Sequence, residues 1–176
     1  MHSISPANEP PPTTSESLAD EAALEPLAAR LVAALPRPAF LALRGELGAG
    51  KTTFVKQVAA ICGLNPADVI SPTFGLIHEF GLPARAGLPE RLVHADLYRL
   101  GGVADLAETG WEDATAGDTW VFLEWPERIT TALPAARIDV LIEIESPTGR
   151  RITLTGYGPA HAAAIKAFKA FKAAPG

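Results

Sequence analysis

Nine residues, Gly45 to Thr53, read GELGAGKTT and match the Walker A pattern, in which two glycines five residues apart precede Lys and Thr. Glycine permits the left-handed backbone angles with which Gly48 and Gly50 can turn successive N–H groups towards phosphate oxygens. The N-terminus of a helix after the loop adds partial positive charge. The pattern therefore predicts a phosphate-binding loop formed by Glu46, Leu47, Gly48, Ala49, Gly50, Lys51, Thr52 and Thr53.

The residues on either side of this loop have the patterns of a strand and a helix. Ala39 to Leu43 form an apolar run of strand length, which is typical of a buried parallel strand. From Thr52 to Cys62 apolar side chains recur every three or four residues, and Gly63 supplies a stop signal. A glycine-rich turn that only resembles a phosphate loop is the alternative, and the order of strand, loop and helix argues against it.

Lys51 and Thr52 indicate what the loop binds. The ammonium of Lys51 can reach the outer phosphates of a nucleoside triphosphate, and the hydroxyl of Thr52 can join the coordination shell of Mg²⁺. The sequence therefore predicts a protein that binds a nucleoside triphosphate together with magnesium.

The 176 residues suit one domain. We expect residues 1–14, which contain three consecutive prolines among polar neighbours, to be a disordered lead-in. Residues 15–158 should form the domain, and 159–176 a basic helical tail. No apolar stretch approaches the about 20 residues that cross a bilayer, and no secretory signal is visible, so we expect a cytoplasmic protein. The only cysteine, Cys62, falls on the inward side of the helix after the loop, as a small apolar side chain.

The net charge of −5 hides an asymmetry, because the last acidic residue is Glu145 while basic residues continue to the end of the chain. These late basic residues are Arg150, Arg151, Lys166, Lys169 and Lys172. They could contact the phosphates of a nucleic acid or an acidic partner. Alternatively, Ile165, Phe168 and Phe171 recur every three residues, which favours a helix that packs its apolar edge on the domain.

Strand and helix patterns alternate through the middle of the chain. The elements we expect are a helix that opens at Ser17 to Glu21 and closes at Pro36, strands over 76–80, 92–97 and 119–124, a short helical region over 103–113, and hairpin strands over 138–144 and 151–155. This order predicts an α/β fold of the P-loop NTPase type, with a mostly parallel central sheet flanked by helices and an antiparallel C-terminal hairpin.

Two carboxylates are expected at strand ends beside the loop. Glu124 is the first charge after the apolar run Trp120 to Leu123, and Asp96 ends the strand before it. One could hold Mg²⁺, directly or through water, while the other positions or deprotonates the attacking water. The residues favour Glu124 for the metal and Asp96 for the water, although the roles could be exchanged. The alternative for either is a helix cap or an ion pair with Arg99 or Arg128.

Three further residues have two interpretations each. Thr73, within Ser71-Pro72-Thr73, lies where a mobile threonine could sense the outermost phosphate, or it belongs to a plain turn. His94 could donate a hydrogen bond to the nucleotide or fill the sheet face. Trp125 could stack on a ligand or partner, or cover the end of the sheet.

Four segments together resemble the bacterial TsaE family, also called YjeE. They are GELGAGKTTF (45–54), SPTF (71–74), HADLYRL (94–100) and LEWPER (123–128), and the resemblance spans roughly residues 17–156. Two departures are the Ala, Pro and Gly-rich connection between Phe80 and Leu92 and the lysine-rich segment after Tyr157.

The resemblance implies a small ATPase that uses ATP and Mg²⁺ to support formation of N6-threonylcarbamoyladenosine (t6A) at position 37 of tRNAs that read codons starting with adenine. Such a protein acts with TsaD and TsaB, contacts tRNA only through that complex, and resets the complex between turnovers. The resemblance gives Lys51 and Thr52 phosphate and magnesium roles, makes Glu124 the magnesium-associated glutamate, and assigns Asp96 and Thr73 to hydrolysis.

Three other functions are possible for a chain with this phosphate loop. A small-molecule kinase needs an arginine-bearing lid segment, and the sequence shows no such cluster. A regulatory GTPase needs an Asn-Lys-x-Asp element, whereas the only asparagines are Asn8 and Asn65. A nucleotide-dependent scaffold without turnover remains open, because the sequence cannot separate slow hydrolysis from none. The base of the bound nucleotide is a separate question, and segment 17–21 or Arg128 could approach it.

Overall fold

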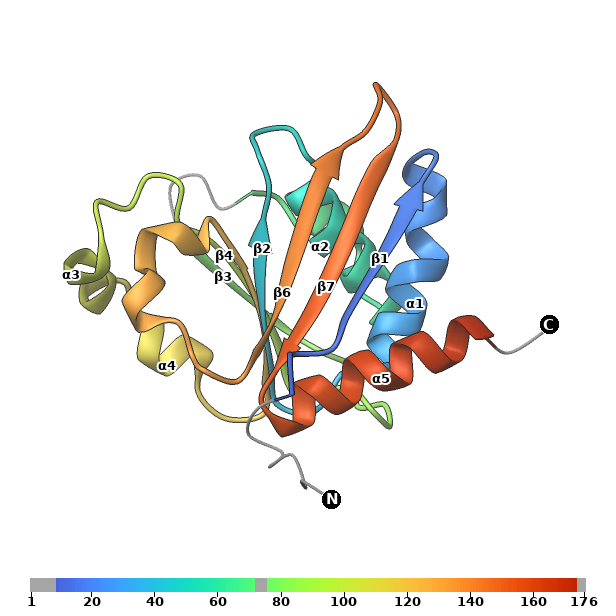
Figure 1. Ribbon diagram of the computed structural model, residues 1–176. Helices are drawn as coiled ribbons and strands as arrows, with labels where there is room; N and C mark the ends of the chain where they lie inside the picture. Colours follow the sequence, from blue (N-terminus) through green and yellow to red (C-terminus); the bar gives the residue numbers. More distant parts are fainter. Residues whose placement is uncertain (1–8, 72–75, 174–176) are drawn as a thin grey trace, which may run out of the picture.

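The computed structural model describes residues 9–71 and 76–173, and within these residues seven strands form one sheet in the order β1-β7-β6-β2-β5-β4-β3 (Figure 1). The strands are β1 (Thr13–Leu18), β2 (Ala39–Arg44), β3 (Ile77–Gly81), β4 (Arg91–Asp96), β5 (Thr119–Glu124), β6 (Arg137–Ile144) and β7 (Arg150–Tyr157). The four central strands β6, β2, β5 and β4 are parallel, β3 and β7 run antiparallel to them, and the edge strand β1 pairs antiparallel with β7.

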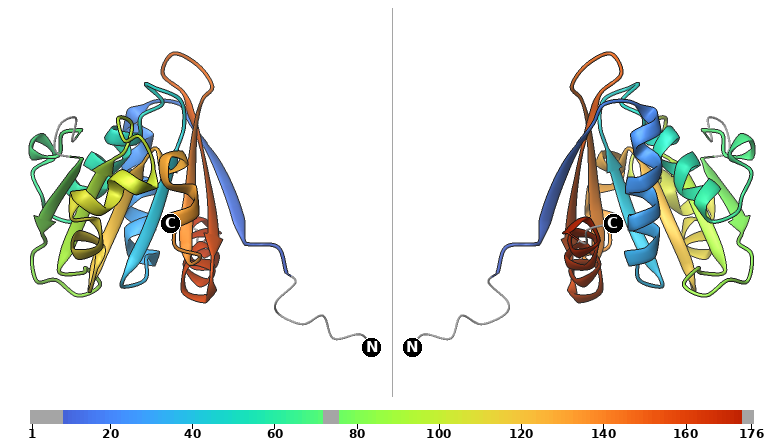
Figure 2. Two further views of the ribbon diagram at one scale, coloured as in Figure 1. Left: turned by 90° about the vertical axis from the view of Figure 1, so that its left-hand side faces the viewer. Right: turned by 90° about the vertical axis from the view of Figure 1, so that its right-hand side faces the viewer.

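The helices lie on both faces of this sheet (Figure 2). They are α1 (Leu24–Ala34), α2 (Lys51–Ile61), α3 (Val103–Leu106), α4 (Trp111–Thr115) and α5 (Pro159–Ala173), with shorter 3-10 turns η2 (Glu21–Ala23), η3 (Pro66–Asp68), η4 (Ala107–Thr109) and η5 (Pro126–Ala132). The α/β fold predicted from the sequence is confirmed. In the described part of the chain, every helix is too short or too polar to span a bilayer.

Two hydrophobic clusters explain why β2 and β5 are the centre of the fold. One cluster joins α1, α2 and α5 to one face of the sheet, and the other joins the region from α3 to η5 to the opposite face. Each face of β2 and β5 is therefore covered, and almost all of their side chains are buried. Strands buried on both faces need apolar residues at consecutive positions, which is the pattern that the sequence shows.

The N-terminal region differs from the prediction. Strand β1 begins at Thr13, inside the expected lead-in, and includes Ser17, which we expected at the start of a helix. The side chain of Asp20 instead caps η2, where it accepts a hydrogen bond from the N–H of Ala23 at 3.1 Å. Strand β1 forms because it pairs with β7, which is distant in sequence, and the hydroxyl oxygens of Ser15 and Thr153 lie 2.7 Å apart.

Helix α5 is part of the hydrophobic core. Ile165 and Phe168 are fully buried, and the guanidinium of Arg30 lies 4.5 Å from the centre of the Phe168 ring. Phe171, expected on the same apolar edge, is 49% exposed. A spacing of exactly three residues drifts around a helix of 3.6 residues per turn, so the third member of the series leaves the contact.

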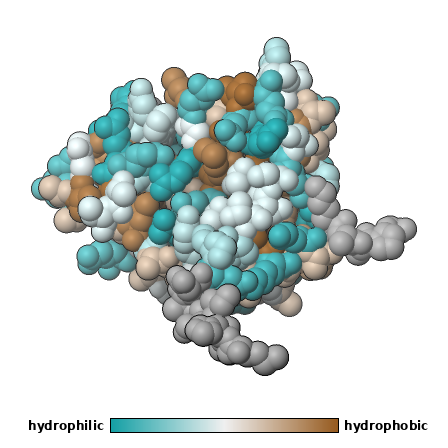
Figure 3. Space-filling model, viewed as in Figure 1, coloured by the Kyte–Doolittle hydropathy of each residue, from teal (hydrophilic) through white to brown (hydrophobic). Residues whose placement is uncertain are grey.

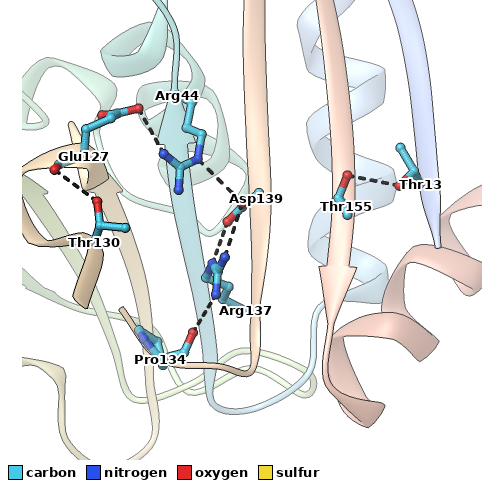
Figure 4. Close-up of polar contacts among 8 residues, drawn as sticks. All are labelled: Thr13, Arg44, Glu127, Thr130, Pro134, Arg137, Asp139 and Thr155. Atoms are coloured by element: carbon cyan, nitrogen blue, oxygen red, sulfur yellow. Dashed lines mark hydrogen bonds and ion pairs between the residues drawn. The ribbon is translucent and has the colours of Figure 1, made fainter. Parts of the chain in front are cut away.

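The face of the sheet seen in Figure 1 has no helix over β6, β7 and β1 among the described residues. Its side chains are mostly hydrophilic or neutral (Figure 3). They include the hydroxyl pair Thr13 and Thr155, 3.1 Å apart, and the ion pair of Arg137 with Asp139 at 2.7 Å (Figure 4). An antiparallel region can leave one face in water when that face is polar.

Phe168 and Phe171 form a matched pair for testing the contribution of α5. We predict that Phe168→Ala lowers the free energy of unfolding by about 3–5 kcal/mol, because it leaves a cavity in the core. Phe171→Ala should change it by less than about 0.5 kcal/mol. Urea denaturation followed by circular dichroism measures both. Equal effects of the two substitutions would show that α5 does not pack as described.

Candidate functional site

The carboxyl ends of three parallel strands meet beside the loop that follows β2. Leu43 of β2 is paired in register with Glu124 of β5, and Glu124 is paired with Asp96 of β4. The structure therefore brings both predicted carboxylates together at the carboxyl ends of two neighbouring strands. In open α/β sheets, ligands bind at the carboxyl ends of the strands.

The predicted loop connects β2 to α2 through glycines with left-handed backbone angles. Gly48 has φ +81° and Gly50 has φ +108°. A Cβ atom placed on either would meet no atom within 4 Å, so the need for glycine here comes from the backbone angle and not from lack of space. The curved backbone of the loop leads directly into the first turn of α2.

The N-terminus of α2 is free of side-chain caps. Gly50 occupies the capping position and has no side chain with which to cap the helix. The first hydrogen bond of the helix runs from the N–H of Phe54 to the carbonyl of Gly50 at 2.9 Å. A helix leaves its first N–H groups without intrahelical partners, and here these belong to the stretch 51–53. Such an end attracts an anion.

Lys51 is buried inside the loop. Its ammonium donates to the carbonyl oxygens of Gly45 at 2.6 Å and Glu46 at 3.0 Å, and lies 4.2 Å from the centre of the Trp125 ring. Burial lowers the pKa of the Lys51 ammonium, and the nearby carboxylates of Glu124 and Asp96 partly offset this effect. The backbone therefore holds this ammonium near the positive end of α2.

Thr52 and Glu124 are in direct contact. The Thr52 hydroxyl donates to Oε1 of Glu124 at 2.7 Å, and Nε2 of the fully buried His94 lies 2.8 Å from the same oxygen. Of the two interpretations of His94, the structure favours a buried residue that contacts Glu124. His94 thereby fixes the position of a carboxylate that is itself only 3% exposed.

The chemistry of these two groups fits Mg²⁺. No cluster of three or more His, Cys, Asp or Glu side chains suited to a metal occurs among residues 9–71 and 76–173. Mg²⁺ is commonly held by one or two protein oxygens together with phosphate oxygens and water. The hydroxyl of Thr52 and the carboxylate of Glu124 are oxygens of this kind.

Asp96 is fixed through both of its carboxylate oxygens. The hydroxyl of Ser71 donates to Oδ2 at 2.7 Å, and the N–H of Tyr98 donates to Oδ1 at 2.9 Å. Thr73 lies outside the described residues, so its predicted role stays a prediction.

Trp125 follows Glu124 in a left-handed conformation, with φ +60°, which is uncommon for a large side chain. Its ring lies 4.9 Å from the Tyr98 ring and also faces the Lys51 ammonium. Trp125 therefore borders the site directly, from the segment immediately after Glu124.

An ion-pair network holds that segment against β2 (Figure 4). Arg44, the last residue of β2, contacts Glu127 of η5 at 3.1 Å and Asp139 of β6 at 3.5 Å. The loop begins one residue after Arg44, and η5 begins two residues after Glu124. The network therefore joins the two chain segments that leave the site.

Two cavities flank the loop. The first, of about 440 Å³, is lined by Leu47, Gly48, Gly50, Lys51, Thr52, Thr53, Ser71, Leu76, Asp96, Tyr98, Arg99, Glu124 and Trp125. The second, of about 410 Å³, lies between the loop, residues 18–24 and the β6–β7 hairpin, and it is lined by Ala49 together with Gly48, Gly50, Thr53 and Arg150 among others. Gly48, Gly50 and Thr53 border both cavities.

The sequence identified most, but not all, of these groups. Glu46 takes part through its carbonyl, which accepts from Lys51 and from the N–H of Ala49 at 3.1 Å. Residues Leu18, Asp20 and Glu21, within the segment expected near the base, line the second cavity. Tyr98 and Arg150 were not predicted as site residues. The segment HADLYRL, which contains Tyr98, was the only available signal for that residue.

A family model and several known proteins match this chain. A family model described as "Threonylcarbamoyl adenosine biosynthesis protein TsaE" matches residues 18–152. The TsaE protein of Bacillus subtilis is 36% identical over 131 residues, which cover 74% of this chain and 78% of that protein. The TsaE protein of Rickettsia bellii is 34% identical over 114 residues, which cover 64% of this chain and 74% of that protein.

A solved structure has the same fold. The crystal structure of YdiB from Bacillus subtilis aligns with a TM-score of 0.68 at 26% identity, over 94% of this chain and 99% of that one. The match extends past the phosphate loop to nearly every strand and helix described above. Together with the family model, which covers well over half of the sequence, it shows that this chain belongs to the TsaE family of threonylcarbamoyl adenosine biosynthesis proteins.

Proposed function

We propose that this protein binds ATP with Mg²⁺ at the phosphate loop and hydrolyses it in support of t6A formation at position 37 of tRNAs that read codons starting with adenine. The observation that carries the proposal is the contact between Thr52 and Glu124. It places the loop hydroxyl and a buried strand-end carboxylate together at the uncapped N-terminus of α2. These are the groups needed to bind a magnesium-bound polyphosphate.

The two cavities suggest how the nucleotide lies. Its phosphates follow the loop residues that border both cavities, and its outermost phosphate lies in the first cavity near Glu124 and Asp96. Adenosine occupies the second cavity, where Leu18, Leu24 and Ile152 provide apolar contacts. The carboxylates of Asp20 and Glu21 can accept hydrogen bonds from the ribose or the amino group of adenine.

Each polar group at the first cavity has a separate role. Lys51 exchanges its carbonyl partners for the outer phosphates, to which an ammonium binds more strongly because they are charged. Thr52 and Glu124 hold Mg²⁺, which when bound offsets phosphate charge. The Asp96 carboxylate, already oriented by Ser71 and Tyr98, accepts a proton from the attacking water. Trp125 and Tyr98 limit the access of bulk water.

Partners complete the cycle. We propose that the TsaD–TsaB complex docks on this protein and that hydrolysis resets the complex between turnovers, so that tRNA is contacted only through the complex. Hydrolysis without the partners should be slow, because no arginine other than Arg99 lines the first cavity in the described structure. Charge that develops on the outer phosphate is then offset only by Lys51, Arg99 and bound Mg²⁺, without a further arginine of the kind that accelerates phosphoryl transfer.

Magnesium binding should depend on the nucleotide. Thr52 and Glu124 alone offer too few oxygens for Mg²⁺, so we predict no measurable heat when MgCl₂ is titrated into the nucleotide-free protein. With a non-hydrolysable ATP analogue present, Mg²⁺ should bind with one ion per chain. Glu124→Gln should weaken this binding at least about tenfold, since it removes the charge of the metal ligand. Tight Mg²⁺ binding without nucleotide would contradict the assignment.

Turnover with partners tests the function itself. We predict that purified TsaD and TsaB increase the ATP hydrolysis rate, and that Asp96→Asn and Glu124→Gln each reduce the stimulated rate by about 100-fold or more. Glu112→Gln, which alters an exposed carboxylate of α4 outside both cavities, is the matched control and should retain the rate. Nucleotide binding without any stimulated hydrolysis would favour a scaffold, and phosphate transfer to an added metabolite would favour a kinase.

A further inference from the structure

Arg150, the first residue of β7, contacts the phosphate loop from the side of the second cavity. Its Nε donates to the carbonyl of Ala49 at 2.9 Å, and one terminal nitrogen lies 3.4 Å from the carbonyl of Gly48. The other terminal nitrogen donates to the carbonyls of Ser146 at 3.1 Å and Gly149 at 2.8 Å. One guanidinium thus joins the loop to the turn of the β6–β7 hairpin.

The contact between Arg150 and the Ala49 carbonyl also fixes the direction of a backbone N–H of the loop, because the two groups belong to one planar peptide. In a trans peptide the C=O and the following N–H point in opposite directions. The carbonyl of Ala49 shares its peptide plane with the N–H of Gly50. When Arg150 holds that carbonyl towards the hairpin, the N–H of Gly50 must point the opposite way, into the loop.

We propose that Arg150 is a positioning residue for nucleotide binding, which sets the direction of the Gly50 N–H by holding the Ala49 carbonyl. This inference rests on the proposed function, because it assigns the ligand of that N–H to a phosphate. Gly50 requires such support because its φ of +108° is one of many values open to glycine. Without the contact, the Ala49–Gly50 peptide is free to rotate.

Hydrogen bonds hold the β6–β7 hairpin in place, so Arg150 has a fixed position from which to contact the loop. The hydroxyl of Thr148 donates to the carbonyl of Ala19 at 3.0 Å, and the N–H of Gly149 donates to the hydroxyl of Ser146 at 2.7 Å. Next to the hairpin, β6 comes so close to the start of the loop that a Cβ on Gly45 would lie 2.6 Å from the carbonyl of Ile142. The hairpin therefore contacts both the phosphate loop and the segment that borders the second cavity.

The loop carbonyls are divided between two cations. Lys51 holds those of Gly45 and Glu46, and Arg150 holds those of Gly48 and Ala49. When a nucleotide draws Lys51 to its phosphates, Arg150 keeps its partners, because they face the hairpin. A lysine at this position could not replace it, since the planar fork of arginine reaches several carbonyls at once.

The test compares Arg150→Ala and Arg150→Lys with Arg151→Ala. Arg151 is the adjacent residue on the opposite face, where it pairs with Glu145, so it controls for loss of charge from the same strand. Calorimetric titration with ADP and with pyrophosphate should show affinities reduced about tenfold in both Arg150 variants, as expected when a charged hydrogen bond is lost. Arg151→Ala should bind as the wild type does.

A second readout does not need a ligand. In NMR spectra of the nucleotide-free protein, the amide nitrogen resonance of Gly50, which belongs to the same peptide as the Ala49 carbonyl, should shift in both Arg150 variants and stay unchanged in Arg151→Ala, with equal melting temperatures for Arg150→Lys and the control. An unchanged Gly50 resonance overturns the inference. So does full affinity in Arg150→Lys, which would reduce the role of Arg150 to charge, or an effect on ADP that is absent for pyrophosphate. Failure of the wild type to bind either ligand would instead contradict the proposed function.

Discussion

The direction of a few backbone N–H groups between β2 and α2 is the constraint on which the rest of this structure depends. Gly48 and Gly50 adopt left-handed angles that shape the loop, and the first amides of α2 have no side-chain cap. Exposed amides in this position attract an anion, whereas the loop carbonyls need donors of their own. Lys51 and Arg150 supply those donors, from opposite sides of the loop.

The sheet supplies the second requirement, which is a pair of carboxylates at the strand ends beside the phosphate loop. Because β4 and β5 are parallel and in register, Asp96 and Glu124 end their strands side by side. Glu124 is buried and held by Thr52 and His94, whereas Asp96 is held by Ser71 and a backbone N–H. The two carboxylates therefore sit in different surroundings, which is consistent with different roles at one polyphosphate.

Local sequence patterns predicted the parts of the fold that depend on neighbouring residues. The phosphate loop, β2 and α2 are contiguous, so glycine spacing and apolar periodicity were sufficient to predict them. Strand β1 was missed because its polar sequence TTSESL becomes a strand only by pairing with β7. The contact of Arg150 with the loop joins residues 101 positions apart, and a basic residue after a turn gave no indication of it. Helical drift explains why Phe171 is exposed while Phe168 is buried.

The most direct measurement compares Gly50→Ala with the wild type by calorimetric titration with a Mg²⁺-bound, non-hydrolysable ATP analogue. A methyl group at Gly50 meets no atom within 4 Å, so the substitution changes only the cost of the backbone angle. Gly102→Ala is the control, since Gly102 has equal space and an extended φ of 161°. The account predicts saturable binding to the wild type and to Gly102→Ala, and affinity at least about tenfold weaker for Gly50→Ala. Equal affinity for all three proteins, or no binding to the wild type, would contradict it.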